Sequence, residues 1–242
     1  MSKLFGGLWL LVCLFEITAS SASAAAIFVP PSLNPGDSYR IIFVTSTKRD
    51  AFATTAVYNT FVTAAANLDP GLQSLTTTWT ALVSTSSTNA LVNTSLVGDT
   101  TTLIFNTNGG LVATGGITVG TGLYGGPGTL HTSPILTEAG AAGSFAWTST
   151  DSSGVTFLPL IDGFTLAGSP GSVVSSWTAA GLIAGIVTLP GGGPVAVPGA
   201  IYGISGLLTV PAVPTPEPGT LVMSFLGAAF LVLVRNRRAR LR

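Results

Sequence analysis

The sequence is poor in charge and almost devoid of histidine and cysteine. Asp, Glu, Lys and Arg together make up 7% of its 242 residues, against about a quarter in an average globular protein. Hydrophobic residues reach 47%, so Thr, Ser, Gly and Asn must cover most of a folded surface. A chain of this length holds about one domain, and its composition suits a β-rich protein that folds outside the cytoplasm.

The single cysteine, Cys13, lies within the first apolar stretch. The rest of the chain therefore has no disulfide, no thiolate nucleophile and no cysteine metal site. Lipid attachment at Cys13 would need the thiol at the end of that stretch rather than in its middle. We expect the folded domain to be stabilised by packing alone.

The single histidine, His131, limits the chemistry in the same way. A histidine-rich metal site is excluded by count, and a Ser-His-Asp site would have to combine His131 with Asp151 or Asp162. No Gly-x-Ser-x-Gly motif marks a nucleophilic serine. We predict no catalytic residue, no metal site and no cofactor, while Ca²⁺ on loop oxygens stays open.

The charges that are present are unevenly distributed, although the formal net charge is +0. Residues 25–219 contain three bases against eight acids, a net charge of −5. So few cations leave no electrostatic footprint for nucleic acid. The compensating bases end the chain and are Arg235, Arg237, Arg238, Arg240 and Arg242.

Residues 1–24 have the layout of a secretory signal peptide. Lys3 precedes an apolar stretch over 4–15, and Ala22 and Ala24 form a small-residue cleavage site. The expected partners are the Sec translocon and signal peptidase. The exported domain is then expected to cover residues 25–211.

Residues 211–242 combine three features in a fixed order. A proline-rich linker at 212–219 contains Pro216, Glu217 and Pro218, and an apolar run follows at 220–234. Proline keeps the linker extended, and the apolar run can enter hydrocarbon as a helix. The terminal arginines, at 235–242, hold its end on the cytoplasmic side. We therefore predict a short transmembrane helix at 220–234 with a basic cytoplasmic tail.

This order resembles the PEP-CTERM sorting signal of bacterial exopolysaccharide producers, with Pro216-Glu217-Pro218 as the tripeptide. The resemblance implies that exosortase, a membrane peptidase, processes the tail while the protein is held in the inner membrane. It also implies a final place at the cell surface or in the extracellular matrix, with exopolysaccharide as a partner.

Local patterns predict one long helix and several strands. The β-branched and aromatic run at 39–45 predicts a central strand, followed by a charged loop at 46–50. A helix over 55–68 is predicted to start at Thr55 and to be closed by Asn67 and the Asp-Pro-Gly at 69–71. Its apolar residues at helical spacing, expected to face the sheet, are Val57, Phe61, Ala64 and Leu68.

Shorter patterns complete the prediction. Asn108-Gly109 supplies the positive φ angles of a tight hairpin turn between 103–105 and 111–113, and residues 115–128 and 190–198 are expected to be loops. The remaining strand candidates are 79–84, 89–93, 157–164, 173–177, 182–189 and 201–210. The expected fold is α+β and predominantly β: one twisted sheet with a packed helix near residues 55–68 and long loops.

The body resembles two groups of proteins. Residues 39–50 and 58–62, with Trp79 and the Ser-Thr pair at 84–85, resemble the opening block of a recurrent group of PEP-CTERM proteins. The later hairpin, the 146–151 segment, Trp177 and the 201–210 strand resemble the endostatin branch of the C-type lectin-like fold. This resemblance implies a helix packed on a twisted sheet. The chain lacks that branch's cysteines and metal-binding histidines, so no ligand transfers.

Four further patterns have competing interpretations. Gly120 to Gly125 match a dinucleotide fingerprint, but Pro127 prevents a helix from starting there, which favours a loop. Asp151, Asp162 and Glu138 could supply a glycosidase pair, although turn aspartates are expected. Thr- and Ser-rich segments at 76–80 and 84–88 are either a hydroxyl array or solvated loops. Aromatic residues that could stack on sugars or fill a core are Tyr58, Trp79, Tyr124, Trp147, Trp177 and Tyr202.

These observations favour an exported envelope or extracellular-matrix protein with a non-enzymatic, structural or surface role. A secreted, lectin-like carbohydrate-binding protein is the first alternative. A polysaccharide hydrolase that uses Asp151, Asp162 or Glu138 is the second.

Overall fold

The computed structural model describes residues 28–50, 54–126, 129–156, 164–172, 181–184, 186–188 and 194–212. The chain divides into two units, Met1–Ser32 with Ser38–Leu208, and Leu33–Asp37 with Thr209–Arg242. The predicted signal peptide, the Pro216-Glu217-Pro218 linker and the terminal apolar run lie outside the described residues. Within the described ranges, no helix has the length and apolar character needed to cross a membrane.

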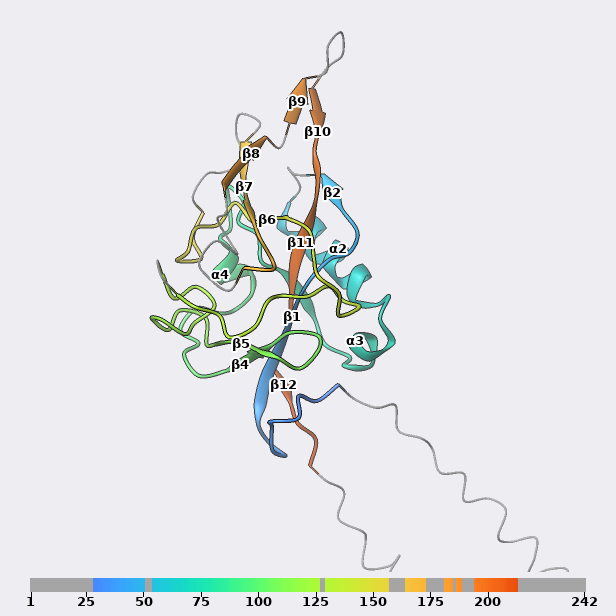
Figure 1. The fold of residues 1–242 in the computed structure, drawn as a ribbon, viewed down its shortest axis with the longest axis vertical. Coiled ribbons are helices and arrows are strands. Elements are labelled where there is room, and N and C mark those ends of the chain that lie inside the picture. Colours follow the sequence, from blue (N-terminus) through green and yellow to red (C-terminus); the bar gives the residue numbers. More distant parts are fainter. Residues whose placement is uncertain are drawn as a thin grey trace, which may run out of the picture. The chain divides into compact units, whose positions relative to one another are not determined.

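Two strands from opposite ends of the first unit form the middle of its sheet (Figure 1). β1 (Ser38–Val44) and β11 (Pro198–Ser205) run antiparallel, with Ile42 opposite Ile204. All residues from 39 to 44 and from 199 to 205 are buried. A strand covered on both faces reads as a continuous apolar run, as the sequence of β1 does. The predicted central strand at 39–45 is confirmed.

The sheet is mixed and curls into a half-barrel. Its strand order is β5-β4-β1-β11-β6-β7-β8, while β2 and β3 pair with β11 off this path. The β-dominated α+β class is therefore confirmed. Besides β1 and β11 the strands are β2 (Arg49–Asp50), β3 (Trp79–Ala81), β4 (Leu103–Phe105), β5 (Leu111–Thr114), β6 (Ala146–Trp147), β7 (Phe164–Gly168), β8 (Gly181–Ala184) and β12 (Leu208–Thr209).

Some predicted loops and strands differ from the structure. β2 lies inside the predicted loop at 46–50, because two of its residues pair with the start of β11. β10 (Pro194–Ala196) lies inside the predicted loop at 190–198 and pairs with β9 (Ile186–Thr188) as a separate two-stranded sheet. The predicted strand at 182–189 is divided between β8 and β9. Apart from Phe164, which begins β7, the candidate at 157–164 lies outside the described residues, as does the candidate at 173–177.

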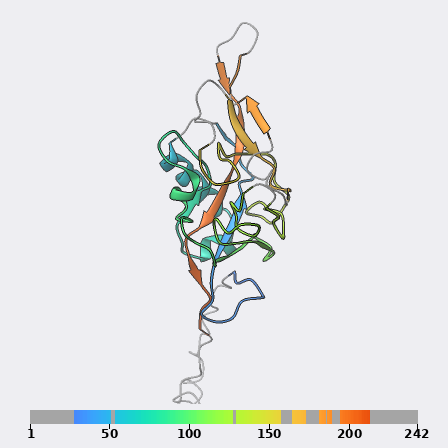
Figure 2. The same cartoon turned by 90° about the vertical axis from the view of Figure 1, so that its left-hand side faces the viewer.

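Helix α2 (Thr55–Ala66) confirms the predicted helix but not the predicted buried face. The side chain of Thr54, rather than Thr55, caps it by accepting a hydrogen bond from Val57 N. The buried residues are Tyr58, Val62, Ala65 and Ala66, whereas Val57 and Leu68 are 36% and 68% exposed. Figure 2 shows α2 on one side of the central strands and the long loops on the other.

Two short helices replace predicted features. Asp69 accepts a hydrogen bond from Leu72 N and begins α3 (Pro70–Ser74), so the Asp-Pro-Gly sequence starts a helix as well as following one. Asn89 accepts from Val92 N and begins α4 (Ala90–Asn93). The predicted strand at 89–93 is wrong, because this side-chain cap favours a helical turn over an extended segment.

The predicted hairpin joins β4 to β5, but its turn differs from the prediction. Gly109 has φ +78°, while Asn108 is not among the residues with positive φ. The turn is organised by Asn106, whose Oδ1 accepts from Asn108 N at 3.1 Å and Gly110 N at 2.8 Å. The buried Asn106 side chain thus stabilises the turn, a role that the sequence pattern assigned to the Asn-Gly pair.

The second unit brings residues 33–37 and 209–212 together. Asp37 N donates to Asn34 O, and Gly36 has φ +92°, so residues 34–37 form a turn. Gly36 N donates to Val210 O at 3.0 Å, and Val210 N donates to Asp37 O at 2.9 Å. The segment that enters the domain is therefore paired with the segment that leaves it.

Candidate functional site

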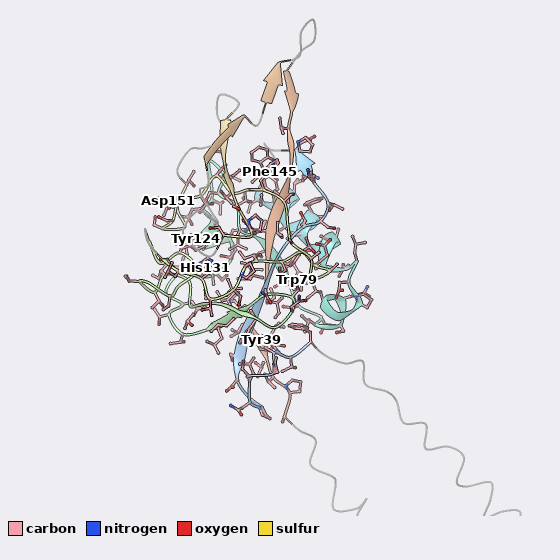
Figure 3. The ribbon with its side chains drawn as sticks, viewed as in Figure 1. Tyr39, Trp79, Tyr124, His131, Phe145 and Asp151 are labelled. Atoms are coloured by element: carbon pink, nitrogen blue, oxygen red, sulfur yellow. The ribbon has the colours of Figure 1, made fainter. Side chains whose placement is uncertain are left out.

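The strongest candidate site is a buried polar cluster that contains the chain's only histidine. We call His131, Tyr124, Tyr202 and Asp151 the His131 cluster; its first three members are buried and Asp151 is half-buried. The negative charge of Asp151 contributes to a raised pKa of Tyr124, and Tyr124 contributes to a raised pKa of Tyr202. His131 bonds to the carbonyl of Leu123, the neighbour of Tyr124. Figure 3 shows Tyr124, His131 and Asp151 in the same part of the first unit.

His131 is held in a neutral state. It lies in the long segment between β5 and β6 and is 4% exposed. Burial lowers its pKa to about 4, and the hydrogen bond to Leu123 only partly opposes this shift. The Nε2 to Leu123 O distance is 3.3 Å. Since a carbonyl only accepts, Nε2 carries the proton, and this nitrogen does not act as a base.

Asp151 organises its own turn. Its Oδ1 accepts from Ser153 N at 2.8 Å, Ser153 Oγ at 2.7 Å and Val155 N at 3.2 Å. Gly154 closes the turn with φ +80°, and a Cβ at this position would lie 2.9 Å from Tyr124 Cγ. The predicted turn at 151–154 is confirmed, and its carboxylate stabilises backbone amides. Asp162, its predicted partner, lies outside the described residues.

The two tyrosines of the cluster, Tyr124 and Tyr202, are buried. Burial raises the pKa of Tyr124, and the negative charge of Asp151 adds to the rise. Burial likewise raises the pKa of Tyr202 well above its ordinary value, with a smaller contribution from Tyr124. Both hydroxyls therefore stay protonated at any physiological pH, and neither serves as a general base.

Ser84 joins a strand end to a helix. Its Oγ accepts from Ala90 N at 3.0 Å, at the start of α4, and bonds to Thr150 Oγ1 at 2.9 Å. Its backbone N donates to Thr148 O at 2.8 Å. These contacts of Ser84 join the start of α4 to the segment that follows β6.

Glu138 has a similar structural role elsewhere. It is buried, and its carboxylate accepts from Ser46 N at 2.9 Å and from Ser46 Oγ. These bonds fix the loop that follows β1. Of the three acids considered for hydrolysis, the two that the structure describes each bind the backbone of a loop.

The aromatic residues considered for sugar stacking fill the core. Trp79 packs edge-on against Phe43, with ring centroids 5.3 Å apart, and Trp147 packs edge-on against Phe145 at 5.4 Å. Five of the six candidates are at most 4% exposed, namely Tyr58, Trp79, Tyr124, Trp147 and Tyr202. Their faces are unavailable to a ligand, and Trp177 lies outside the described residues.

The other sequence patterns are also resolved by local structure. Residues 115–126 contain no helix, so the glycine pattern at 120–125 forms a loop. Ser84 and Thr85 are buried, whereas Thr76 and Thr78 are exposed, so these segments do not form one flat array. Asn93 satisfies a glycosylation pattern, but its Nδ2 donates to Ala81 O at 2.7 Å and to Asn59 Oδ1 at 2.9 Å.

Two polar features escaped sequence analysis. Arg40, a lone cation in an apolar strand, is buried with Nε 3.9 Å from Asp99 Oδ2, and its Nη1 donates to Ser205 O at 3.0 Å. Burial lowers its pKa, which the charge of Asp99 opposes. Asn59 accepts from Ala81 N at 2.8 Å and joins α2 to β3 and α4. In the sequence, the one signal that pointed to Arg40 was its positive charge within a hydrophobic run.

No protein-family model and no curated protein matches the chain. Within the described part of the chain, no group of three or more His, Cys, Asp or Glu residues is placed to hold a metal ion. The interpretation of the His131 cluster therefore depends on its own contacts, which position loops.

Proposed function

We propose that this chain is an exported envelope or extracellular-matrix protein with a non-enzymatic structural or surface role. The observation that carries the proposal is the order of features at the C-terminus: Pro216-Glu217-Pro218, an apolar run at 220–234, and a terminal cluster of arginines. The signal peptide at 1–24 starts export through the Sec translocon. An exosortase-type peptidase then processes the tail at the inner membrane.

The contacts within the first unit support a non-enzymatic role. His131 is buried and neutral, Ser84 accepts from the first amide of α4, and Asp151 and Glu138 bind loop amides. Each of these four side chains thus has a structural task in the part of the chain that the structure describes. A lectin-like role is less well supported, because the five described candidate aromatic residues are buried and would expose no stacking face.

The sorting part of the proposal predicts the fate of a linker variant. Replacing Pro216, Glu217 and Pro218 together by alanine removes the tripeptide but leaves the apolar run and the arginines. We expect this variant to stay in the membrane fraction at the mass of the unprocessed protein. Cell fractionation followed by mass spectrometry of the C-terminus measures both properties.

A matched control replaces Pro214, in the same linker, by alanine. We expect this control to be processed like the wild type, because the tripeptide is intact. If the tripeptide variant is cleaved and released as the wild type is, the exosortase proposal is wrong. If the control also remains unprocessed, linker stiffness rather than the tripeptide directs cleavage.

A further inference from the structure

We infer that β11 is the closing strand of the first unit: this unit becomes a stable, protease-resistant body only when residues 198–205 join the sheet. The inference concerns folding and goes beyond the proposed sorting role, on which only its consequence for export rests. In an exported chain, β11 crosses the membrane after all its partner strands. Folding is thereby tied to near-complete transfer of the domain.

The pairing of β11 supports this inference. It pairs with β1, β2, β3 and β6, and among the described strands β2 and β3 pair with β11 alone. Hydrogen bonds between the β11 backbone and side chains of the β1 region also join residues far apart in the chain. Arg40 Nη1 donates to Ser205 O across 165 positions, and Ile201 N donates to Thr45 Oγ1 across 156 positions.

β11 is packed closely against its neighbours on both sides. A Cβ at Gly203 would lie 2.8 Å from the ring of Phe43 and 3.1 Å from Val62 Cβ, so β11 fills the space between β1 and α2. A Cβ at Gly199 would lie 2.3 Å from Trp147 Nε1. Absence of the strand therefore uncovers large apolar side chains on both β1 and β6, which is unfavourable in water.

Arg40 adds an electrostatic reason. Its guanidinium is buried and donates to Ser205 O at 3.0 Å and Thr94 O at 3.3 Å. Without β11 it loses the Ser205 carbonyl, and a partly desolvated charge with fewer partners is costly. Without β11, β1 therefore cannot stay buried beside β4 and keep all the hydrogen bonds of Arg40. We therefore expect the sheet to form and open as one unit.

Native-state hydrogen exchange on the full chain in detergent tests this inference. Ile204→Ala truncates a fully buried side chain of β11. If β11 closes the whole sheet, the slowest amides of β1, β3, β4 and β5 should all exchange faster by the same factor, about 100-fold or more. Val119→Ala, at a residue that is 87% exposed, is the control and should leave these rates unchanged.

The inference is overturned if β4 and β5 keep wild-type rates in Ile204→Ala while β3 and β11 accelerate. That result would show a stable half-sheet that does not need β11. A second measurement uses the wild type: in pulse-labelled refolding, amides of β1 and β4 should become protected in the same phase as those of β11. Earlier protection of β1 and β4 contradicts the inference. Neither measurement depends on tail processing, so its failure leaves the sorting proposal intact.

Discussion

At the scale of single residues, the fold shifts the pKa of His131 by an amount that stability measurements can detect. Its pKa falls from 6.5 to about 4, chiefly because burial disfavours the charged ring. The unfolded chain therefore binds a proton at a higher pH than the folded protein does. The stability that comes from neutral His131 is present above pH 6.5 and is lost as the pH falls towards 4.

We therefore expect the free energy of unfolding to decrease by about 2 kcal/mol between pH 7 and pH 5. His131→Gln removes the titrating ring but keeps a side-chain donor for the Leu123 carbonyl. In this variant, the decrease over the same interval should largely disappear. Urea denaturation of both proteins at several pH values measures the difference, and an equally steep dependence in the variant would assign the effect to another group.

At the scale of elements, helix α2 shows what a residue pattern specifies and what it leaves open. Its existence and approximate ends followed from apolar spacing and cap residues. Its buried face did not follow from the pattern, because two pairs of apolar residues, Tyr58 with Val62 and Val57 with Phe61, have the same helical spacing. The face that packs is decided by the neighbours, including Gly203 of β11, which leaves room for Val62.

A pair of identical substitutions on this helix tests the corrected face. Val62→Ala removes buried methyl groups and should lower the free energy of unfolding by about 2 kcal/mol. Val57→Ala, on the 36% exposed side, should change it by less than about 0.5 kcal/mol. Chemical denaturation provides both values. Equal losses at the two positions would mean that both faces pack.

The short elements have a related explanation. Asn89 and Asp69 were recognisable as cap residues, yet α3 and α4 were not predicted, because helices this short produce no periodic pattern. β2 and β10 were missed because their strand character comes from a partner strand rather than from their own sequence. The Asn106 side chain organised the hairpin turn through bonds that residue spacing does not reveal.

At the scale of the whole molecule, the proposed processing at the C-terminus would change the net charge of the protein. The full chain has a formal net charge of +0 and an isoelectric point near 6.5. Residues 25–219, with three bases and eight acids, carry −5. Loss of the signal peptide alone removes Lys3 and Glu16 together and leaves the balance unchanged.

Isoelectric focusing therefore distinguishes two mature forms. If the tail is removed as proposed, we expect the mature protein to focus at a clearly more acidic pH than the full chain, because five arginines are lost. A mature protein that has lost only its signal peptide should focus close to the full chain. The second outcome, in cells with an active exosortase, contradicts removal of the tail.

The sequence by itself determined the low charge, the absence of a disulfide in residues 25–211, the β-dominated class and the central position of β1, and it predicts the sorting signals. These properties depend on composition and on patterns between near neighbours. Tertiary structure alone decided the buried face of α2, the ion pair of Arg40 with Asp99, and the burial of His131. It also decided the central place of β11 beside β1. Such contacts join residues far apart in the chain, and their energies depend on which groups the fold removes from water together.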